Sequence, residues 1–290
     1  MVSKHPEWIM LDAIKTTIIR NNRFHCEHGW DIDLDDGSSN YEIYNNLCLN
    51  GGIKLREGFY RKVYNNIVLN NGFHPHVWFK NSHDVFTRNI IMAHHMQIGV
   101  NHWGDKVDGN FFTSERDLLV SKEYGVEQNG EFGDPGFINP EKGNFGVAEN
   151  SPTKSAIGFE DFDMDKFGVT SARLKGMIEK PSVPALLIER KEETAKIYEW
   201  HGFKVKNIET PGEQSAAGLN EITGVLISEV PELSPVPLQK GDVILSCWDK
   251  QIKDVLDLQK TEKGNAWKGR LDLKVWRNQK LIGITVDTNW

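Results

Sequence analysis

The feature that most constrains this chain is a repeat of about 22 residues in its first 110 positions. Each repeat unit holds short alternating segments separated by Asn and Gly turns, and such units are too short for a strand–helix–strand crossover. Units of this kind bury their apolar faces by stacking on one another. We therefore expect a ladder of asparagine side chains at an inner turn, each satisfying the backbone of a neighbouring coil. Its members are Asn22, Asn46, Asn66 and Asn89.

A second series runs in the same period and alternates apolar with polar residues. Its members are Ile9–Asp12, Ile32–Asp35, Ile53–Arg56, Val77–Lys80 and Ile98–Asn101. Alternation on a strand sends the apolar residues inward and their neighbours outward. With rungs ~4.8 Å apart, the outward side chains form a patch the size of one or two sugar units. They are Asp31, Asp33, Asp35, Lys54, Arg56, His76, Trp78, Lys80, Gln97 and Asn101.

The ladder is followed by a segment of turns, Asp134–Pro140, Gly143–Phe145 and Ser151–Pro152. Together they resemble the right-handed parallel β-helix proteins of the pectate-lyase-like superfold over residues 8–175, particularly bacterial polysaccharide-degrading enzymes. Family 141 of the glycoside hydrolases is the nearest resemblance. It implies a mainly β fold, with a β-helix of about five rungs and a closing segment over residues 1–180. It also implies a polysaccharide or oligosaccharide substrate and a periplasmic or extracellular location.

Glycoside hydrolysis needs two carboxyl groups, ~5–5.5 Å apart for retention or ~6.5–9.5 Å for inversion. Asp33 and Asp35, two apart on one strand, fall near the longer separation, and Asp36 and Glu57, on neighbouring rungs, near the shorter. The sequence leaves both pairs open as catalytic residues. The other outward side chains are predicted to bind substrate, with tryptophan stacking on a sugar ring: Asp31, Lys54, Arg56, His76, Trp78, Lys80 and Asn101.

Two alternatives stay open at this stage. In a polysaccharide lyase acting on a uronate, Asp31, Asp33 and Asp35 would hold Ca²⁺, which prefers hard oxygen ligands, and Lys54 or Arg56 would abstract a proton. In a non-catalytic glycan- or peptide-binding scaffold, the chain would bind its ligand without cleaving it. The hydrolase is preferred and requires no cofactor.

The second half changes character after the prolines and charges of 181–196, which predict a linker. Residues 197–290 contain Leu238–Leu245 (LQKGDVIL) and a helix-like Asp254–Leu258, and they resemble a PDZ domain of the bacterial, circularly permuted kind. A PDZ domain captures a protein C-terminus as an added strand. The resemblance places Gly218 and Leu219 in the carboxylate loop and Val225, Leu226 and Ile227 in the pairing strand. Ser234–Leu238 departs from the family's helix start, so a purely structural PDZ fold is the alternative.

Composition excludes several classes. The chain has 290 residues, a net charge of −7 and three cysteines. An acidic surface argues against nucleic-acid binding, and no apolar run is long enough to span a membrane. Three dispersed cysteines give neither a disulfide framework nor a thiolate zinc site. Residues 1–15 lack the pattern of a signal peptide. Because the first predicted rung begins within ten residues of Met1, we expect a C-terminal fragment of a longer enzyme.

Overall fold

The computed structural model describes residues 4–27, 29–169, 171–177, 182–186, 196–231 and 234–287. The chain separates into two compact units, 1–189 and 190–290. The division falls within the stretch 181–196, where the sequence predicts a linker. Part of that stretch nevertheless packs on the first unit, because Val183 and Leu186 contact its core and the amide of Asn70 donates to the carbonyl of Ala185.

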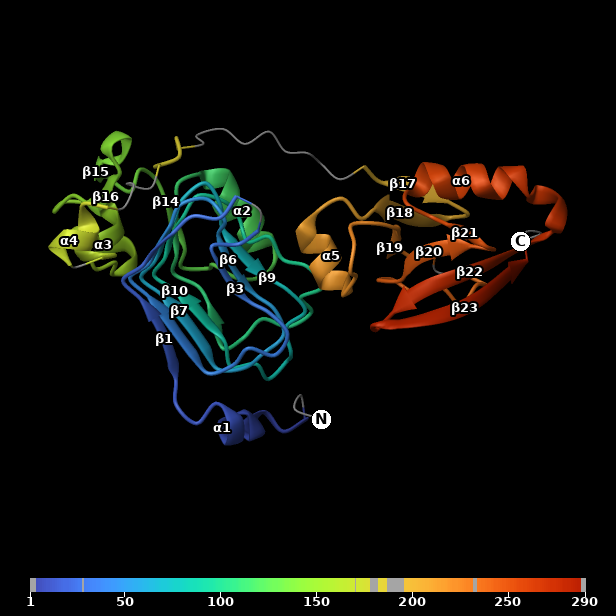
Figure 1. The fold of residues 1–290 in the computed structure, drawn as a ribbon, viewed down its shortest axis with the longest axis horizontal. Helices are drawn as coiled ribbons and strands as arrows, with labels where there is room; N and C mark the ends of the chain where they lie inside the picture. Colours follow the sequence, from blue (N-terminus) through green and yellow to red (C-terminus); the bar gives the residue numbers. More distant parts are fainter. Residues whose placement is uncertain are drawn as a thin grey trace. The chain divides into compact units, whose positions relative to one another are not determined.

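The first unit is a parallel β-helix of about five turns, with three sheets running along its axis (Figure 1). The first sheet contains β1 (Thr17–Arg20), β4 (Tyr41–Tyr44), β7 (Arg61–Tyr64), β10 (Val85–Thr87) and β12 (Lys106–Val107). The second contains β2 (Arg23–Phe24), β5 (Leu47–Cys48), β8 (Ile67–Val68), β11 (Ile90–Ile91), β13 (Phe111–Phe112) and β14 (Glu131–Phe132). The third contains β3 (Ile32–Leu34), β6 (Ile53–Leu55) and β9 (Phe73–Pro75). The predicted fold class is thereby confirmed.

The asparagine ladder lies at the turn between the first two sheets. Each ladder amide donates to the side-chain oxygen of the asparagine in the next coil, at 3.0 Å from Asn22 to Asn46 and 2.9 Å from Asn66 to Asn89. The side-chain oxygen that accepts each of these bonds also accepts the backbone N–H of the same donor asparagine, so that Asn46 Oδ1 accepts both the amide and the backbone N–H of Asn22. Asn89 Oδ1 accepts the same two groups of Asn66. The ladder predicted from the repeat is therefore confirmed, and its amides satisfy buried backbone groups that would otherwise be costly.

The structure extends the ladder beyond the predicted positions. Asn89 donates to Asn110, and Asn110 donates to Glu127 at 2.6 Å. Glu127 in turn accepts from His95 Nε2 at 2.7 Å, with both side chains fully buried. A carboxylate thus ends the row of amide donors. The residue before each ladder asparagine has a positive φ, 56° at Asn21 and 54° at Asn65, which explains the Asn–Asn pairs because asparagine tolerates this region.

Two parts of the predicted repeat are wrong. Ile9–Asp12 is not a rung but a short helix, α1, preceded by the 3-10 helix η2 (Pro6–Trp8). The third strand of the third coil is Phe73–Pro75, not Val77–Lys80, because β6 pairs Lys54 with His74. Val77 turns the chain with a φ of 52°. His76, and not Val77, forms the bridge to Ile98.

The segment after the coils covers the outer face of the second sheet. It contains the hairpin of β15 (Phe137–Asn139) and β16 (Asn144–Val147) with η3 (Pro140–Lys142) between them, α3 (Pro152–Ile157), η4 (Met164–Lys166) and α4 (Ala172–Lys175). The helix α2 (Glu115–Glu123) precedes β14 and buries Leu118 in the core inside the coils. Phe145 and Phe159 pack on the outward apolar residues Leu47 and Ile67 in one cluster. That face of the β-helix is therefore occupied by the chain itself.

The second unit is a small α+β domain, as expected from the sequence. Its antiparallel sheet has the order β17 (Tyr198–Trp200), β18 (Phe203–Asn207), β19 (Val225–Glu229), β20 (Val243–Cys247), β22 (Arg270–Arg277) and β23 (Lys280–Asp287), with β21 (Lys250–Gln251) beside β20. Its helices are α5 (Pro211–Ala217), α6 (Val255–Gly264) and η5 (Ala266–Lys268). Val255 and Leu258 of α6 are buried in the core against the sheet. In the described parts of the chain, no helix is long and apolar enough to span a bilayer.

Candidate functional site

The candidate site is the outer face of the short sheet formed by β3, β6 and β9. Asp33 pairs with Lys54 and Lys54 with His74 in register. The next outward positions on the three coils are Asp35, Arg56 and His76. Ile32, Ile53 and Phe73 point inward and are buried. The alternation predicted for the first two strands is therefore confirmed, and it places carboxylates beside cations on one face.

Lys54 is the centre of this face. Its side chain is only 1 % exposed, and its ammonium contacts Asp33 Oδ1 at 3.1 Å and Asp35 Oδ1 at 3.0 Å. Two oxygens that each lie about 3 Å from one nitrogen are at most about 6 Å apart, which is below the separation typical of inverting glycosidases. The structure therefore brings Asp33 and Asp35 closer together than their positions on an extended strand predict.

Arg56 connects a second pair of carboxylates. Its Nε lies 3.1 Å from Asp36 Oδ1 and 2.5 Å from Glu57 Oε2, with the Arg56 side chain 5 % exposed. The pair predicted on neighbouring rungs is thus also joined through one cation. Four carboxylates and two cations leave this face with an excess of two negative charges when all six groups are ionised. An electronegative face opposes an anionic sugar and favours a group that gains positive charge.

The environment separates the pKa values of Asp33 and Asp35. Burial raises the pKa of Asp33 above its ordinary value, and the hydrogen bond and charge of Lys54 only partly offset that effect. Burial also acts on Asp35, but there the hydrogen bond and charge of Lys54, with the charge of Arg56, hold the pKa below its ordinary value. Neighbouring carboxyls with pKa values displaced in opposite directions suit one proton donor and one ionised partner.

Trp30 covers part of this face, and the sequence did not single it out. It lies in the loop before β3, is half-buried, and its ring centroid is 4.2 Å from Lys54 Nζ. Its ring lies nearly perpendicular to the rings of His74 and His76, at centroid distances of 5.9 and 5.7 Å. Trp30 therefore occupies the position of an aromatic platform beside the carboxylates, the role that the sequence assigned to Trp78.

His76 lies beneath the same face and is fully buried. Burial, together with the charges of Lys54 and Arg56, lowers its pKa to about 3. The ring is therefore neutral at any pH near neutrality. Among the described residues neither ring nitrogen has a hydrogen-bond partner, which is uncommon for a buried polar group. A proton-carrying role near neutral pH does not fit this environment.

Several predicted substrate contacts lie elsewhere. Asp31 accepts backbone N–H groups from Cys26, Asn50 and Gly51 and so fastens two turns. Trp78 is buried in the core, and its indole N–H donates to the carbonyl of Leu55 at 2.8 Å. The outward position predicted for Trp78 is wrong because the chain turns at Val77. Lys80 and Asn101 are exposed in a turn and a bend outside the three strands.

The calcium alternative does not fit these side chains. Asp31 is committed to backbone donors, while Asp33 and Asp35 are paired with Lys54. Within the described residues, no three His, Cys, Asp or Glu side chains converge as a metal site. The lyase alternative also required Lys54 or Arg56 to reach a substrate proton, whereas both side chains are buried in ion pairs.

The peptide site predicted on the PDZ-like domain is misplaced. Val225, Leu226 and Ile227 lie in β19, which is paired on one edge with β18 and on the other with β20, so it offers no edge to an added strand. Gly218 ends α5 with a φ of 68°, and its N–H and that of Leu219 close the last turn of the helix. Those two N–H groups are therefore not available for a carboxylate.

The sequence held a signal for the missed residues. Leu49-Asn50-Gly51-Gly52-Ile53-Lys54 recurs twenty positions later as Leu69-Asn70-Asn71-Gly72-Phe73-His74. Aligning the glycines gives the observed register and places His74 beside Lys54. The glycines are required because a Cβ at Gly52 would lie 2.6 Å from the carbonyl oxygen of Gly72. Trp30 directly precedes the aspartate series, but no pattern indicates that it folds back over Lys54.

Comparisons with known proteins find similar solved structures for part of the chain. No family model and no curated protein matches the chain. Among solved structures, the PDZ domain of HtrA3 bound to a phage-derived ligand (FGRWV) is similar at 20 % sequence identity. The match covers 32 % of this chain and 87 % of that one, with a TM-score of 0.26.

Proposed function

We propose that this chain is a carbohydrate-active enzyme that hydrolyses a glycosidic bond on the outer face of β3, β6 and β9. The parallel β-helix is consistent with carbohydrate-active proteins. The observation that carries the proposal is the pair of carboxyls, Asp33 and Asp35, that share the buried Lys54 ammonium and whose pKa values are displaced in opposite directions.

In this mechanism Asp33 is the general acid. Its raised pKa favours the protonated form that donates to the leaving oxygen. Asp35, whose pKa is lowered, attacks the sugar as its carboxylate, and Asp33 then activates the water that releases the product. The short separation of the two groups supports this retaining course. The excess negative charge stabilises the oxocarbenium-like transition state, and it favours a neutral glycan over a uronate.

The other side chains have supporting roles. Lys54 holds both carboxyls in place, and Arg56 positions Asp36 and Glu57 along the same face. Trp30 offers a ring on which a sugar can stack. A glycan is therefore the proposed partner of this unit.

The proposal is tested with a panel of neutral plant and host polysaccharides, assayed by release of reducing ends. Asp33→Asn and Asp35→Asn are each expected to lower release by at least 100-fold, within the range of ~10²–10⁴ for a positioned acid or base. Both variants should still bind the glycan. The matched control is Asp105→Asn, which removes an exposed carboxylate paired with His83 on another part of the coils. Full activity in both site variants would refute the assignment.

A further inference from the structure

The C-terminal domain closes one edge of its own sheet with a very short strand. β17 pairs antiparallel with β18 through Tyr198–Val205, Glu199–Lys204 and Trp200–Phe203. The two strands are joined by a two-residue turn, His201 and Gly202, with φ of 47° and 78°. Both residues have the positive φ of the hairpin turns that match strand twist. The edge of β18 that an added strand would need is thus already occupied.

The side chains of β17 fasten it to α6 as well as to the sheet. Trp200 is 4 % exposed and belongs to the core of the domain. Its indole N–H donates to Glu262 Oε2 at 2.9 Å, and His201 Nε2 lies 2.5 Å from Glu262 Oε1. Glu262 is on the last turns of α6, while the start of α6 is fixed to β18 by Asn207 Oδ1, which accepts the N–H of Val255. β17 therefore contacts both elements that frame this edge.

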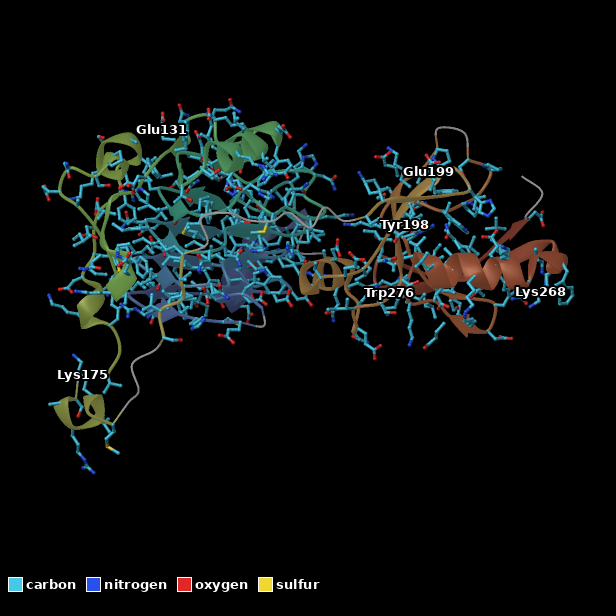
Figure 2. The ribbon with its side chains drawn as sticks, turned by 90° about the horizontal axis from the view of Figure 1, so that it is seen from above. Glu131, Lys175, Tyr198, Glu199, Lys268 and Trp276 are labelled. Carbon is cyan, nitrogen blue, oxygen red and sulfur yellow. The ribbon has the colours of Figure 1, made fainter. Side chains whose placement is uncertain are left out.

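The alternation of β17 is that of a bound peptide. Tyr198 and Glu199 are neighbours on β17 (Figure 2). Trp200 is buried, Glu199 is exposed, and Tyr198 is half-buried against the same core as Trp200. Strand addition obtains its affinity from main-chain hydrogen bonds and its specificity from pockets for alternate side chains. Here Trp200 is buried in the core of the domain and Tyr198 packs partly against that core, so the two alternate side chains of β17 both contact the domain. β17 is thus a short strand, held by three residue pairs and one deeply buried side chain.

We propose that the edge of β18 beside α6 is a strand-binding site that β17 keeps closed. Its ligand is an extended peptide with an aromatic residue two positions before a tryptophan, the pattern of Tyr198-Glu199-Trp200. A tethered segment competes at an effective concentration on the order of 1 mM. The apparent affinity of a free peptide whose intrinsic dissociation constant is micromolar is therefore reduced by a large factor as long as β17 occupies the edge.

The test uses the full chain and a fluorescein-labelled peptide, Lys-Ile-Tyr-Glu-Trp, with binding measured by fluorescence anisotropy. Trp200→Ala removes the deeply buried side chain, and Tyr198→Pro removes a ladder N–H while leaving Trp200 in place. Each variant is expected to bind the peptide at least tenfold more tightly than the unaltered chain. Glu199→Ala, which changes only the exposed residue between them, is the matched control and is expected to leave binding unchanged.

Hydrogen exchange of β22 and β23 verifies that the domain stays folded in each variant. Equal binding by the unaltered chain and both variants would show that β17 does not close the site. No binding by either folded variant would show that the edge is not a strand-binding site. Equal binding of a peptide with the same residues in scrambled order would also overturn the proposal. The site would then not recognise an aromatic residue two positions before a tryptophan.

Discussion

Replacing His76 with phenylalanine is expected to remove part of the acid sensitivity of the β-helix. His76 is fully buried, with a pKa lowered to about 3 from the ordinary 6.5 by burial and by the charges of Lys54 and Arg56. As pH falls below about 6.5, the unfolded chain takes up a proton at this residue and the folded chain does not. Stability contributed by neutral His76 is therefore complete above that pH and is lost progressively toward about pH 3.

The magnitude follows from linkage. Between pH 7.5 and 5.0, one histidine that titrates near 6.5 only in the unfolded state lowers the free energy of unfolding by about 2 kcal/mol. Phenylalanine has a similar shape and no ring nitrogen to leave unpaired, so His76→Phe should not lower stability at pH 7.5. The stability lost between the two pH values should be about 2 kcal/mol smaller in the variant.

The measurement must report on the first unit alone, because the chain has two. Met92 packs on the apolar cluster between the second sheet and the segment that covers it. Its oxidation by hydrogen peroxide across a urea series, read by mass spectrometry, therefore follows unfolding of the first unit. His102→Gln, a change at an exposed histidine, is the matched control. An equal pH dependence in His76→Phe and the unaltered chain would refute the reasoning.

Three further predictions concern the ladder, the core and the site. Asn89→Ala removes buried donors and acceptors from the ladder and should cost about 2–4 kcal/mol of stability in the same urea assay, whereas Asn101→Ala, at an exposed bend, should cost less than about 0.5 kcal/mol. Arg61→Met leaves the fully buried Asp84 without its ion-pair partner and should cost about 3–5 kcal/mol. A change below about 1 kcal/mol in thermal or urea unfolding would contradict this. Burial raises the pKa of Asp33, so the rate of hydrolysis should fall as pH rises through that pKa and Asp33 loses its proton. A pH–rate profile whose basic limb is identical in Asp33→Glu would count against Asp33 as the acid.

The sequence predicted the β-helix because its ladder is a local and repeated signal. Each asparagine follows a residue that must adopt positive φ, so the spacing of Asn–Asn pairs reports the coils directly. The end of the ladder was missed because Glu127 supplies the last acceptor with a different residue type. The helix at Ile9–Asp12 was missed because four residues that fit a strand's alternation also fit one helical turn.

The site was predicted in part for a related reason. Asp33, Asp35 and Lys54 lie on strands whose register follows from the repeat. Trp78 was misplaced because two alternating stretches, 73–76 and 77–80, compete for one strand, and only the glycine spacing separates them. The burial of Lys54 depends on Trp30, which folds over it from the preceding loop, and no periodicity encodes that contact.

The peptide site was misplaced because motif order does not show which strand edges are open. Val225–Ile227 reads as a strand in the sequence, as it is in the structure. Its pairing on both edges depends on β18 and β20, which lie elsewhere in the chain. Edge strands are identified by the order of the whole sheet.

The most direct measurement compares two leaving groups on the sugar that the polysaccharide screen identifies. A natural glycosidic bond needs a proton from Asp33 to depart, whereas a dinitrophenyl leaving group does not. Asp33→Asn is expected to lose at least 100-fold on the natural bond and to retain most of its rate of bond cleavage on the dinitrophenyl glycoside, measured by single-turnover release. Equal losses on both substrates, or no hydrolysis of any glycan by the unaltered chain, would contradict the account.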